Sequence, residues 1–342
     1  MKKTGLLSIF LILILLVSGC EKAADDRVVG TVQGENIYFW ELSFFLDSVK
    51  TELLNQANIS GDKEIQEFWK NSDIDGVSAA EVAKSKAFQQ AVLFKSKVIL
   101  AKKSGETLSD DTKNTIQKQI ADAKTSLGGD AAFKETLSNM GINESNYKQL
   151  LEDSALVNNY FSRLAQDGTI SVSDEAMNEY YNTHLSDYRA TVTAKHILFA
   201  TVDENKNPKS EEEQKKAAET AKQVYDEIAA GTLDFDTAMQ EYSEDPGLKS
   251  NPDGYTFTRG KMIKEFENAA FDLEVGQVSE PVKSSFGWHI IKLTDARTSS
   301  FDEVKNDIYQ TLASSAFDDY AKQQSASFKI TKDDSVINTV KF

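Results

Sequence analysis

The sequence predicts an α+β protein in which a small sheet-containing domain is inserted into a mainly helical lobe. Apolar residues recur at helical spacing from residue 40 to about residue 188, and again over 301–324. Between these stretches, helical patterns alternate with short β-prone runs in the order β-α-α-β-α-β-β. The β-prone runs lie at 193–199, 255–258, 278–283 and 288–293.

The expected domain boundaries follow these changes of pattern. An amphipathic helix cannot bury its apolar stripe alone, so the helix over 301–324 is expected to complete the amino-terminal lobe. The central domain is then an insertion, which is tolerated when the two ends of a domain lie close together. The expected segments are a signal peptide (1–19), a tether (20–27), the first part of the helical lobe (28–188), the inserted domain (189–298) and the helix and strand that complete the lobe (299–342).

Composition excludes several classes of partner. The chain has 342 residues, 54 of them acidic and 38 basic, and its formal net charge is -16. Nucleic acid and anionic lipid headgroups both require a basic face, so neither is an expected partner of the folded body. The single cysteine, Cys20, excludes an intrachain disulfide and a thiolate metal cluster.

The first twenty residues are predicted to be a targeting segment. The apolar run over 6–17 follows two lysines and is too short to span a bilayer as a mature helix. Val17-Ser18-Gly19-Cys20 resembles the lipobox of bacterial lipoproteins, which implies cleavage before Cys20 and its modification with lipid such as palmitate. The alternative is an ordinary secretory signal with a cysteine nearby by chance.

Start and stop signals divide the helical lobe into elements. A β-prone run at 28–32 and a turn precede the first helix, an opening similar to the amino-terminal module of chaperones of the trigger-factor and SurA type. Polar residues that suit helix N-caps and glycines that suit helix ends mark the later boundaries. Helices are expected over 40–56 and 79–103, from a Ser109 cap to Gly128, over 131–139, from an Asn143 cap to Gly168, and after a Ser173 cap; a last strand is expected at 328–330.

The inserted domain carries equally clear local signals. Ser210 and Glu213 form a capping-box pattern at the start of its first helix, and Gly231 is expected to end that helix. A second helix is expected over 235–242. Pro246 disfavours helical geometry at the preceding Asp245, so Asp245 is expected in a turn.

Several separate motifs of this domain resemble the parvulin peptidyl-prolyl isomerases. The motifs are His196-Ile197-Leu198, Phe257-Thr258-Arg259-Gly260-Lys261-Met262, Phe266-Glu267, Pro281-Val282 and Phe286-Gly287-Trp288-His289-Ile290-Ile291, and they occur in the family's order and spacing. The resemblance implies a four-stranded antiparallel sheet with helices. Together with the lipobox and the flanking helices, the chain resembles bacterial PrsA-type foldase lipoproteins with a SurA-like chaperone lobe.

The resemblance also implies which residues form the active site. His196 and His289 match the paired histidines of the family, Asp245 matches its cysteine-or-aspartate position, and Ser284 matches its hydroxyl position. The pocket for the proline ring corresponds to Phe257, Met262 and Phe266. The expected catalytic residues are therefore His196, Asp245, Ser284 and His289.

The implied reaction needs no cofactor, metal ion or covalent nucleophile. Rotation about an X-Pro bond is slow because amide resonance must be broken. A catalyst of this step binds the twisted amide better than either planar form. An apolar pocket holds the ring, and polar groups stabilise the atoms that gain charge on twisting. Asp245 beside two imidazoles is expected to orient them and to set their protonation.

Two departures from the family pattern bear on substrate binding. The family often has Gly-Gly-Asp-Leu-Gly before its phenylalanine, whereas this chain has Asn251-Pro252-Asp253-Gly254-Tyr255 and so lacks the leucine that helps to close the pocket. The loop over 202–210 contains Lys206 and Lys209 but no arginine cluster, so phosphopeptide specificity is not expected.

Other interpretations of the same residues remain open. The two strand histidines would also serve to hold the fold, and with Asp245 they are possible metal ligands by type, although their spacing does not favour a metal. The expected partners are unfolded secreted polypeptides and, through Cys20, the cell membrane; the resemblance also allows a homodimer through the helical lobe. The alternative function is a holdase chaperone with an inactive parvulin domain. A solute-binding lipoprotein is disfavoured because βαβ repeats are absent from the pattern.

Overall fold

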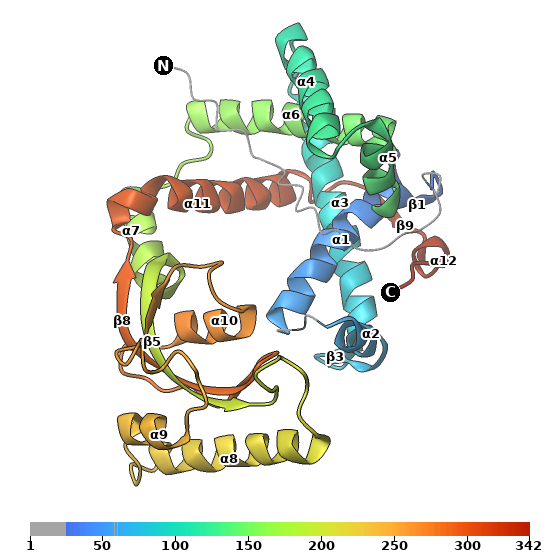
Figure 1. The fold of residues 1–342 in the computed structure, drawn as a ribbon. Coiled ribbons are helices and arrows are strands. Elements are labelled where there is room, and N and C mark those ends of the chain that lie inside the picture. Colours follow the sequence, from blue (N-terminus) through green and yellow to red (C-terminus); the bar gives the residue numbers. More distant parts are fainter. Residues whose placement is uncertain (1–24, 58, 60) are drawn as a thin grey trace. The chain divides into compact units, whose positions relative to one another are not determined.

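Two compact units make up the chain, and a computed structural model describes residues 25–57, 59 and 61–342 of it (Figure 1). Of the described residues, those up to 171 and those from 312 to 342 form unit 1, and 172–311 form unit 2. Sequence analysis placed 172–188 and 299–311 with the helical lobe, whereas contacts group both segments with unit 2. The predicted signal peptide, including Cys20, lies outside the described residues.

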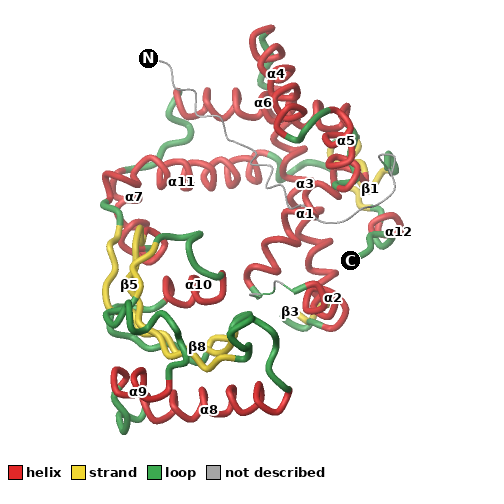
Figure 2. The backbone as a smooth tube through the Cα atoms, viewed as in Figure 1, coloured by secondary structure: helices red, strands yellow, loops and turns green. Residues whose placement is uncertain are grey.

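Helices form most of unit 1, with three short strands around its amino terminus and a separate two-stranded hairpin (Figure 2). One further helix, α11 (Phe301–Gln324), contains the boundary between the two units. The other elements of unit 1 are β1 (Val28–Val32), β2 (Glu35–Tyr38), α1 (Phe39–Gln56), α2 (Asp62–Asn71), β3 (Asp73–Ile74), β4 (Val77–Ser78), α3 (Ala79–Lys103), α4 (Asp110–Ser126), α5 (Asp130–Asn139), α6 (Glu144–Gln166), β9 (Ile330–Lys332) and α12 (Asp334–Ile337).

The predicted helix starts in unit 1 are confirmed by their capping bonds. Ser109 Oγ accepts the N–H of Thr112 at 3.1 Å. Asn143 forms a reciprocal capping box with Asn146, with distances of 2.9 and 3.0 Å. These bonds satisfy backbone donors that have no partner within the helix. The carboxyl-terminal half of α11 buries Phe317 against Tyr160 and Phe161 of α6, as expected for a helix that completes this lobe.

Several short elements of unit 1 were not expected from the sequence, and its last strand is displaced from the predicted position. Helix α2 carries Phe68 and Trp69 into the core; with Ile65 they follow helical spacing, so the pattern was present in the sequence. The β3–β4 hairpin spans only two residues in each strand and turns at Asp75-Gly76, both with positive φ. The last strand was predicted at 328–330 and lies instead at 330–332, followed by α12.

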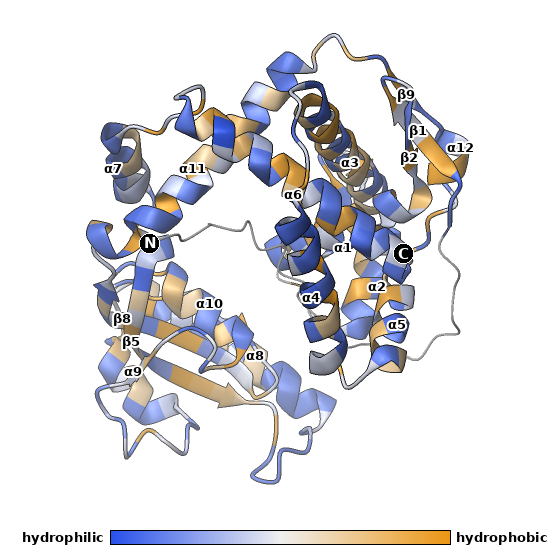
Figure 3. Cartoon of the chain, turned by 90° about the horizontal axis from the view of Figure 1, so that it is seen from above, coloured by the Kyte–Doolittle hydropathy of each residue, from blue (hydrophilic) through white to orange (hydrophobic). Residues whose placement is uncertain are grey.

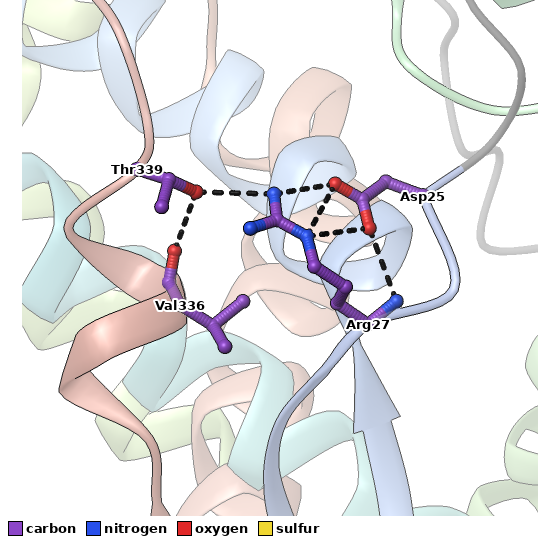
Figure 4. A network of polar contacts seen from close by, with 4 residues as sticks. All are labelled: Asp25, Arg27, Val336 and Thr339. Atoms are coloured by element: carbon purple, nitrogen blue, oxygen red, sulfur yellow. Dashed lines mark hydrogen bonds and ion pairs between the residues drawn. The ribbon is translucent and has the colours of Figure 1, made fainter.

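The two ends of the described chain meet in the small sheet of unit 1. Its strand order is β2-β1-β9, so a strand from the start of the chain pairs with one from its end. Arg27 pairs with Asp25 through two nitrogens and donates to Thr339 Oγ1 at 3.1 Å, and Thr339 donates to the carbonyl of Val336 at 2.7 Å (Figure 4).

Unit 2 is built on a four-stranded antiparallel sheet of order β6-β5-β8-β7, which confirms the predicted fold class. The two central strands, β5 and β8, are longer than the predicted runs. Only two residues of the expected run at 278–283 form a strand. The elements are α7 (Asp174–Thr183), the 3-10 helix η1 (Leu185–Tyr188), β5 (Arg189–Ala200), α8 (Glu211–Ala229), α9 (Phe235–Tyr242), β6 (Tyr255–Phe257), α10 (Lys264–Asp272), β7 (Val282–Lys283) and β8 (Gly287–Thr298).

Each face of this sheet is covered by different helices. Ile197, Phe199 and Ile290 pack with α8 and α9 on one face. Val192 and Ile291 pack with α10 on the other face. Much of α8 is hydrophilic, as its blue colour in Figure 3 indicates, and the predicted capping box at Ser210 and Glu213 is present. The sheet is therefore a two-sided apolar layer, and the polar side chains on it require a separate explanation.

Gly287 begins β8 in a conformation that only glycine adopts easily. Its φ is +148°, and a Cβ atom built on it would lie 2.2 Å from the carbonyl oxygen of Phe199. Because that oxygen belongs to the backbone of β5, it cannot move aside without disturbing the sheet. Gly231, after α8, also has a positive φ (+71°), but a Cβ there would meet nothing within 4 Å.

We therefore expect Gly287→Ala to lower the free energy of unfolding by about 3 kcal/mol or more, because backbone strain and a clash combine. The matched variant Gly231→Ala should cost only about 1 kcal/mol, because strain acts alone. Urea unfolding followed by circular dichroism measures both. Equal losses in the two variants would contradict the close approach between β5 and β8.

Candidate active site

Two histidines lie on the α10 face of the sheet in unit 2. In the β5–β8 register, His196 is opposite Ile291 and Leu198 is opposite His289. Residues two apart on a strand share a face, so the two histidines are diagonal neighbours on one face. Their ring centroids are 5.3 Å apart and the rings are nearly perpendicular, at 87°.

A turn after α9 carries Asp245 to the edge of β5. Ser243 Oγ accepts the N–H of Leu198 at 3.1 Å, and the N–H of Glu244 donates to the carbonyl of Leu198 at 2.8 Å. These bonds hold the turn beside the part of β5 that β6 does not cover, since β6 pairs only with residues 192–194. Asp245 Oδ2 then lies 3.4 Å from His196 Nε2, a close contact that lacks the alignment of a hydrogen bond.

The Asp245 carboxylate is held in its charged form. Burial of the group acts to raise its pKa, but His196 and the hydrogen bonds from Tyr255 and Gly247 outweigh that effect and lower the pKa to about 2. Tyr255 Oη donates to Oδ2 at 2.7 Å, and the N–H of Gly247 donates to Oδ1 at 2.9 Å. The site therefore contains a fixed negative charge beside His196 at neutral pH.

His289 is buried and neutral. Only 4% of it is exposed, and burial, followed by the proximity of His196, lowers its pKa to about 3. Its Nε2 lies 2.8 Å from Ser284 Oγ, which also accepts the N–H of Phe286 at 3.0 Å. Nδ1 has no hydrogen-bond partner among the described residues. Ser284 therefore restrains the ring of His289 through one nitrogen only.

Aromatic side chains form the apolar part of the site. The ring of Phe266, on α10, stands edge-on to His196 and His289 with centroid distances of 5.1 and 5.4 Å. The ring centroids of Phe257 and Phe266 are 5.8 Å apart, and both side chains are buried. Met262 is half-buried at the border of the same cluster. Phe257 and Phe266 thus form the floor of the apolar part, and Met262 is its accessible residue.

The structure brings all of the predicted site residues together on the α10 face. His196, His289, Phe257, Phe266 and Met262 belong to one cluster or touch it directly. Asp245 lies beside His196, and Ser284 is hydrogen-bonded to His289. In the part of the chain that the structure describes, no group of three or more His, Cys, Asp or Glu side chains is arranged to hold a metal ion.

Sequence reasoning missed two residues that hold this arrangement. Tyr255 stacks on His196, with ring centroids 5.7 Å apart and planes at 9°, and bonds to Asp245. Glu267 is buried and accepts the N–H groups of Lys261 and Met262 at 3.1 and 3.4 Å. Tyr255 lies two residues before Phe257 in a predicted strand, so the pattern indicated that the two side chains share one face but not that Tyr255 bonds to Asp245. Glu267 belongs to a motif that carries the family resemblance, but the motif did not indicate that its carboxylate accepts backbone N–H groups.

Comparison with known proteins defines the class of this site. The family described as PPIC-type PPIASE domain (rotamase) matches residues 196–295. Unit 2 therefore contains a parvulin-type peptidyl-prolyl cis-trans isomerase domain, as the motifs predicted.

The curated relatives identify the family of the whole chain. Foldase protein PrsA of Caldanaerobacter subterraneus subsp. tengcongensis is 29% identical over 292 residues, which cover 85% of this chain and 81% of that protein. Foldase protein PrsA of Geobacillus kaustophilus is 39% identical over 166 residues, 48% of this chain and 51% of that protein. The chain is thus related to the PrsA foldases, although it aligns with only about half the length of several of them.

One solved relative covers most of the chain. The crystal structure of peptidylprolyl isomerase (PrsA) from Bacillus cereus aligns with 89% of this chain and 92% of that chain, at 23% identity and a TM-score of 0.31. A similarity of this size adds no argument about the site.

The charge state of the site predicts how stability depends on pH. The ordinary pKa of 6.5 for a histidine falls to about 3 for folded His289, so between these values the unfolded chain binds a proton that the folded chain does not. Stability should therefore fall as pH falls from 6.5 towards 3. Asp245, with a folded pKa of about 2 against an ordinary value of 3.8, contributes stability above pH 3.8 that is lost as pH falls towards 2.

We expect the free energy of unfolding to lose at most about 1.4 kcal/mol per pH unit from His289 within its window. The variant His289→Gln keeps a polar side chain but does not titrate, so its stability should depend less on pH between 4 and 6. Urea unfolding at several pH values measures the difference. Parallel curves for wild type and variant would show that His289 does not stay neutral in the fold.

Proposed function

We propose that His196, Asp245, Ser284 and His289 catalyse rotation about X-Pro bonds and that Phe257, Met262 and Phe266 receive the proline ring. The observation that supports this proposal is the proximity of the His196, His289 and Phe266 rings. Their centroids lie 5.1 to 5.4 Å apart, beside the charged Asp245. An apolar surface thus adjoins polar groups of fixed orientation. That combination suits a substrate whose ring is apolar and whose amide is polar.

The physical basis of catalysis is preferential binding of the twisted amide. Twisting removes resonance, so the carbonyl oxygen and the nitrogen lone pair change their charge and their capacity for hydrogen bonds. Groups that are already fixed in a water-poor site stabilise that change without reorganising. Ser284 restrains His289 through a hydrogen bond, and the charged Asp245 lies 3.4 Å from His196, so we assign both residues orienting roles. Phe266 and Met262 restrain the proline ring.

We propose that the clients are unfolded polypeptides outside the cytoplasmic membrane and that unit 1 holds them. Support comes from a groove of about 670 Å³ in unit 1, in which apolar side chains such as Phe88, Leu93 and Ile330 lie among polar and charged ones. Ile330 is 49% exposed, although large apolar side chains are usually covered in a folded lobe. A foldase needs both a surface that holds a chain and a site that isomerises it. A homodimer through this lobe belongs to the same proposal, and light scattering measures it.

The proposed location depends on the amino-terminal segment. We propose that Cys20 carries lipid and anchors the protein to the cell membrane, on the basis of the lipobox-like Val17-Ser18-Gly19-Cys20. Within residues 25–57, 59 and 61–342, no helix is long and apolar enough to cross a membrane. Two or more acyl chains suffice for stable anchoring, since each buried methylene contributes about 0.8 kcal/mol.

Catalysis by the histidine site predicts the outcome of a refolding assay. Wild-type protein should accelerate the refolding of a substrate whose slow step is prolyl isomerisation. His196→Ala should lower that acceleration about tenfold or more, because it removes the ring between Asp245, Phe266 and His289. The control His184→Ala changes a histidine outside the site and should keep wild-type rates. Equal rates for wild type and His196→Ala would contradict the enzyme proposal and leave a holdase.

Anchoring predicts how the protein partitions. In cells that express the full chain, the wild type should fractionate with membranes and with detergent in phase separation. Cys20→Ala should appear in the soluble fraction or remain uncleaved, because it lacks the thiol that carries lipid. Incorporation of labelled palmitate provides a direct measurement. Labelling of the variant to the same extent would contradict lipidation at Cys20.

A further inference from the structure

The segment that departs from the parvulin pattern has an unusual backbone. Gly254 stands where the family often has leucine, and its φ is +95°. A Cβ at residue 254 would lie 2.6 Å from the carbonyl oxygen of Ala194 on β5. No leucine fits there while β6 keeps its pairing with β5, in which Tyr255 is opposite Ala194. The missing leucine is therefore a consequence of how closely this segment approaches the sheet.

Tyr255, the next residue, occupies the space beside His196. Its ring lies parallel to the imidazole at 5.7 Å, and its hydroxyl donates to Asp245 Oδ2 at 2.7 Å. The same oxygen is the one that lies 3.4 Å from His196 Nε2. With the N–H of Gly247 on Oδ1, both carboxylate oxygens are fixed. One tyrosine thus contacts the histidine with its ring and the aspartate with its hydroxyl.

Gly247 makes this contact possible. A Cβ at residue 247 would lie 2.1 Å from the Tyr255 hydroxyl oxygen and 3.3 Å from the ring carbon that bears it. Its φ is not in the positive range, so an alanine there would not be strained by its backbone. The position of the Tyr255 hydroxyl beside Asp245 therefore requires that residue 247 has no side chain.

We propose that Tyr255 is a positioning residue of the isomerase site, which holds Asp245 Oδ2 beside His196 and covers one face of the imidazole. The inference rests on the proposed function of the histidine site and extends it to a residue outside the family's set. Tyr255 keeps its proton over a wide pH range, because burial and its bond to Asp245 raise its pKa to about 12. The hydroxyl of Tyr255 therefore stays a donor, and the carboxylate of Asp245 stays a charged acceptor, at neutral and mildly basic pH.

Two single variants and their combination test the proposal in the full chain. Tyr255→Phe keeps the ring and removes the hydroxyl. Gly247→Ala keeps the hydroxyl and displaces it with a methyl group. Both should lower kcat for a proline-containing tetrapeptide about tenfold with little change in KM, since positioning acts on the reacting geometry rather than on binding.

The double variant should have a kcat no lower than that of either single variant, because the second change removes a contact that is already lost. Tyr225→Phe, on the α8 side of the sheet, is the matched control and should behave as wild type.

A second readout does not depend on activity. In both single variants the titration of the Asp245 carboxyl, followed by carbon NMR, should move up from about 2 towards the ordinary value of 3.8. Wild-type kcat together with an unmoved Asp245 titration in Tyr255→Phe would overturn the proposal, as would additive losses in the double variant. If one single variant fails to fold, the other decides. If the wild type shows no isomerase activity while the Asp245 titration still moves, the proposed function fails and the positioning role of Tyr255 stands.

Discussion

The pairing of β5 with β8 is the constraint on which the site depends. The register places Leu198 opposite His289 and His196 opposite Ile291, so both imidazoles lie on one face of the sheet. Because side chains alternate along a strand, a slip of one residue in β8 would move His289 to the α8 face and separate it from His196. The close approach at Gly287 restricts such a slip, since backbone oxygen of β5 occupies the space beside it. The geometry of the site is therefore a property of the sheet.

Burial then determines the charges within that geometry. His289 is almost completely removed from water and stays neutral, whereas Asp245 is kept charged by the nearby His196 and by hydrogen bonds from Tyr255 and Gly247. The imidazole of His289 therefore stays neutral and the carboxylate of Asp245 stays charged at neutral pH. Stabilisation of a twisted amide requires groups of this kind, which are already oriented before the substrate arrives.

Sequence reasoning succeeded where the signal is local and failed where it depends on distant residues. The capping residues Ser109, Asn143 and Ser210 each act on a residue three positions away, so the helix starts could be predicted from the sequence. The motifs around His196 and His289 were sufficient to predict the fold of the inserted domain and to choose candidate site residues. The role of Tyr255 was not predictable, because it depends on the space left by Gly247 and on the turn that brings Asp245 to β5. Helix α2 was missed although Ile65, Phe68 and Trp69 follow helical spacing.

The pairing of β1 with β9 has a consequence for the order in which the chain acquires its structure. Thr31 and Thr331 are hydrogen-bonded across 300 positions, and Arg27 and Thr339 across 312. Unit 2 is continuous in sequence, so all of its strands are synthesised before β9, the last strand of unit 1. Contacts between such distant positions form slowly and late. The isomerase domain in unit 2 can therefore fold before unit 1, which contains both ends of the described chain. Folding of unit 2 does not require β9.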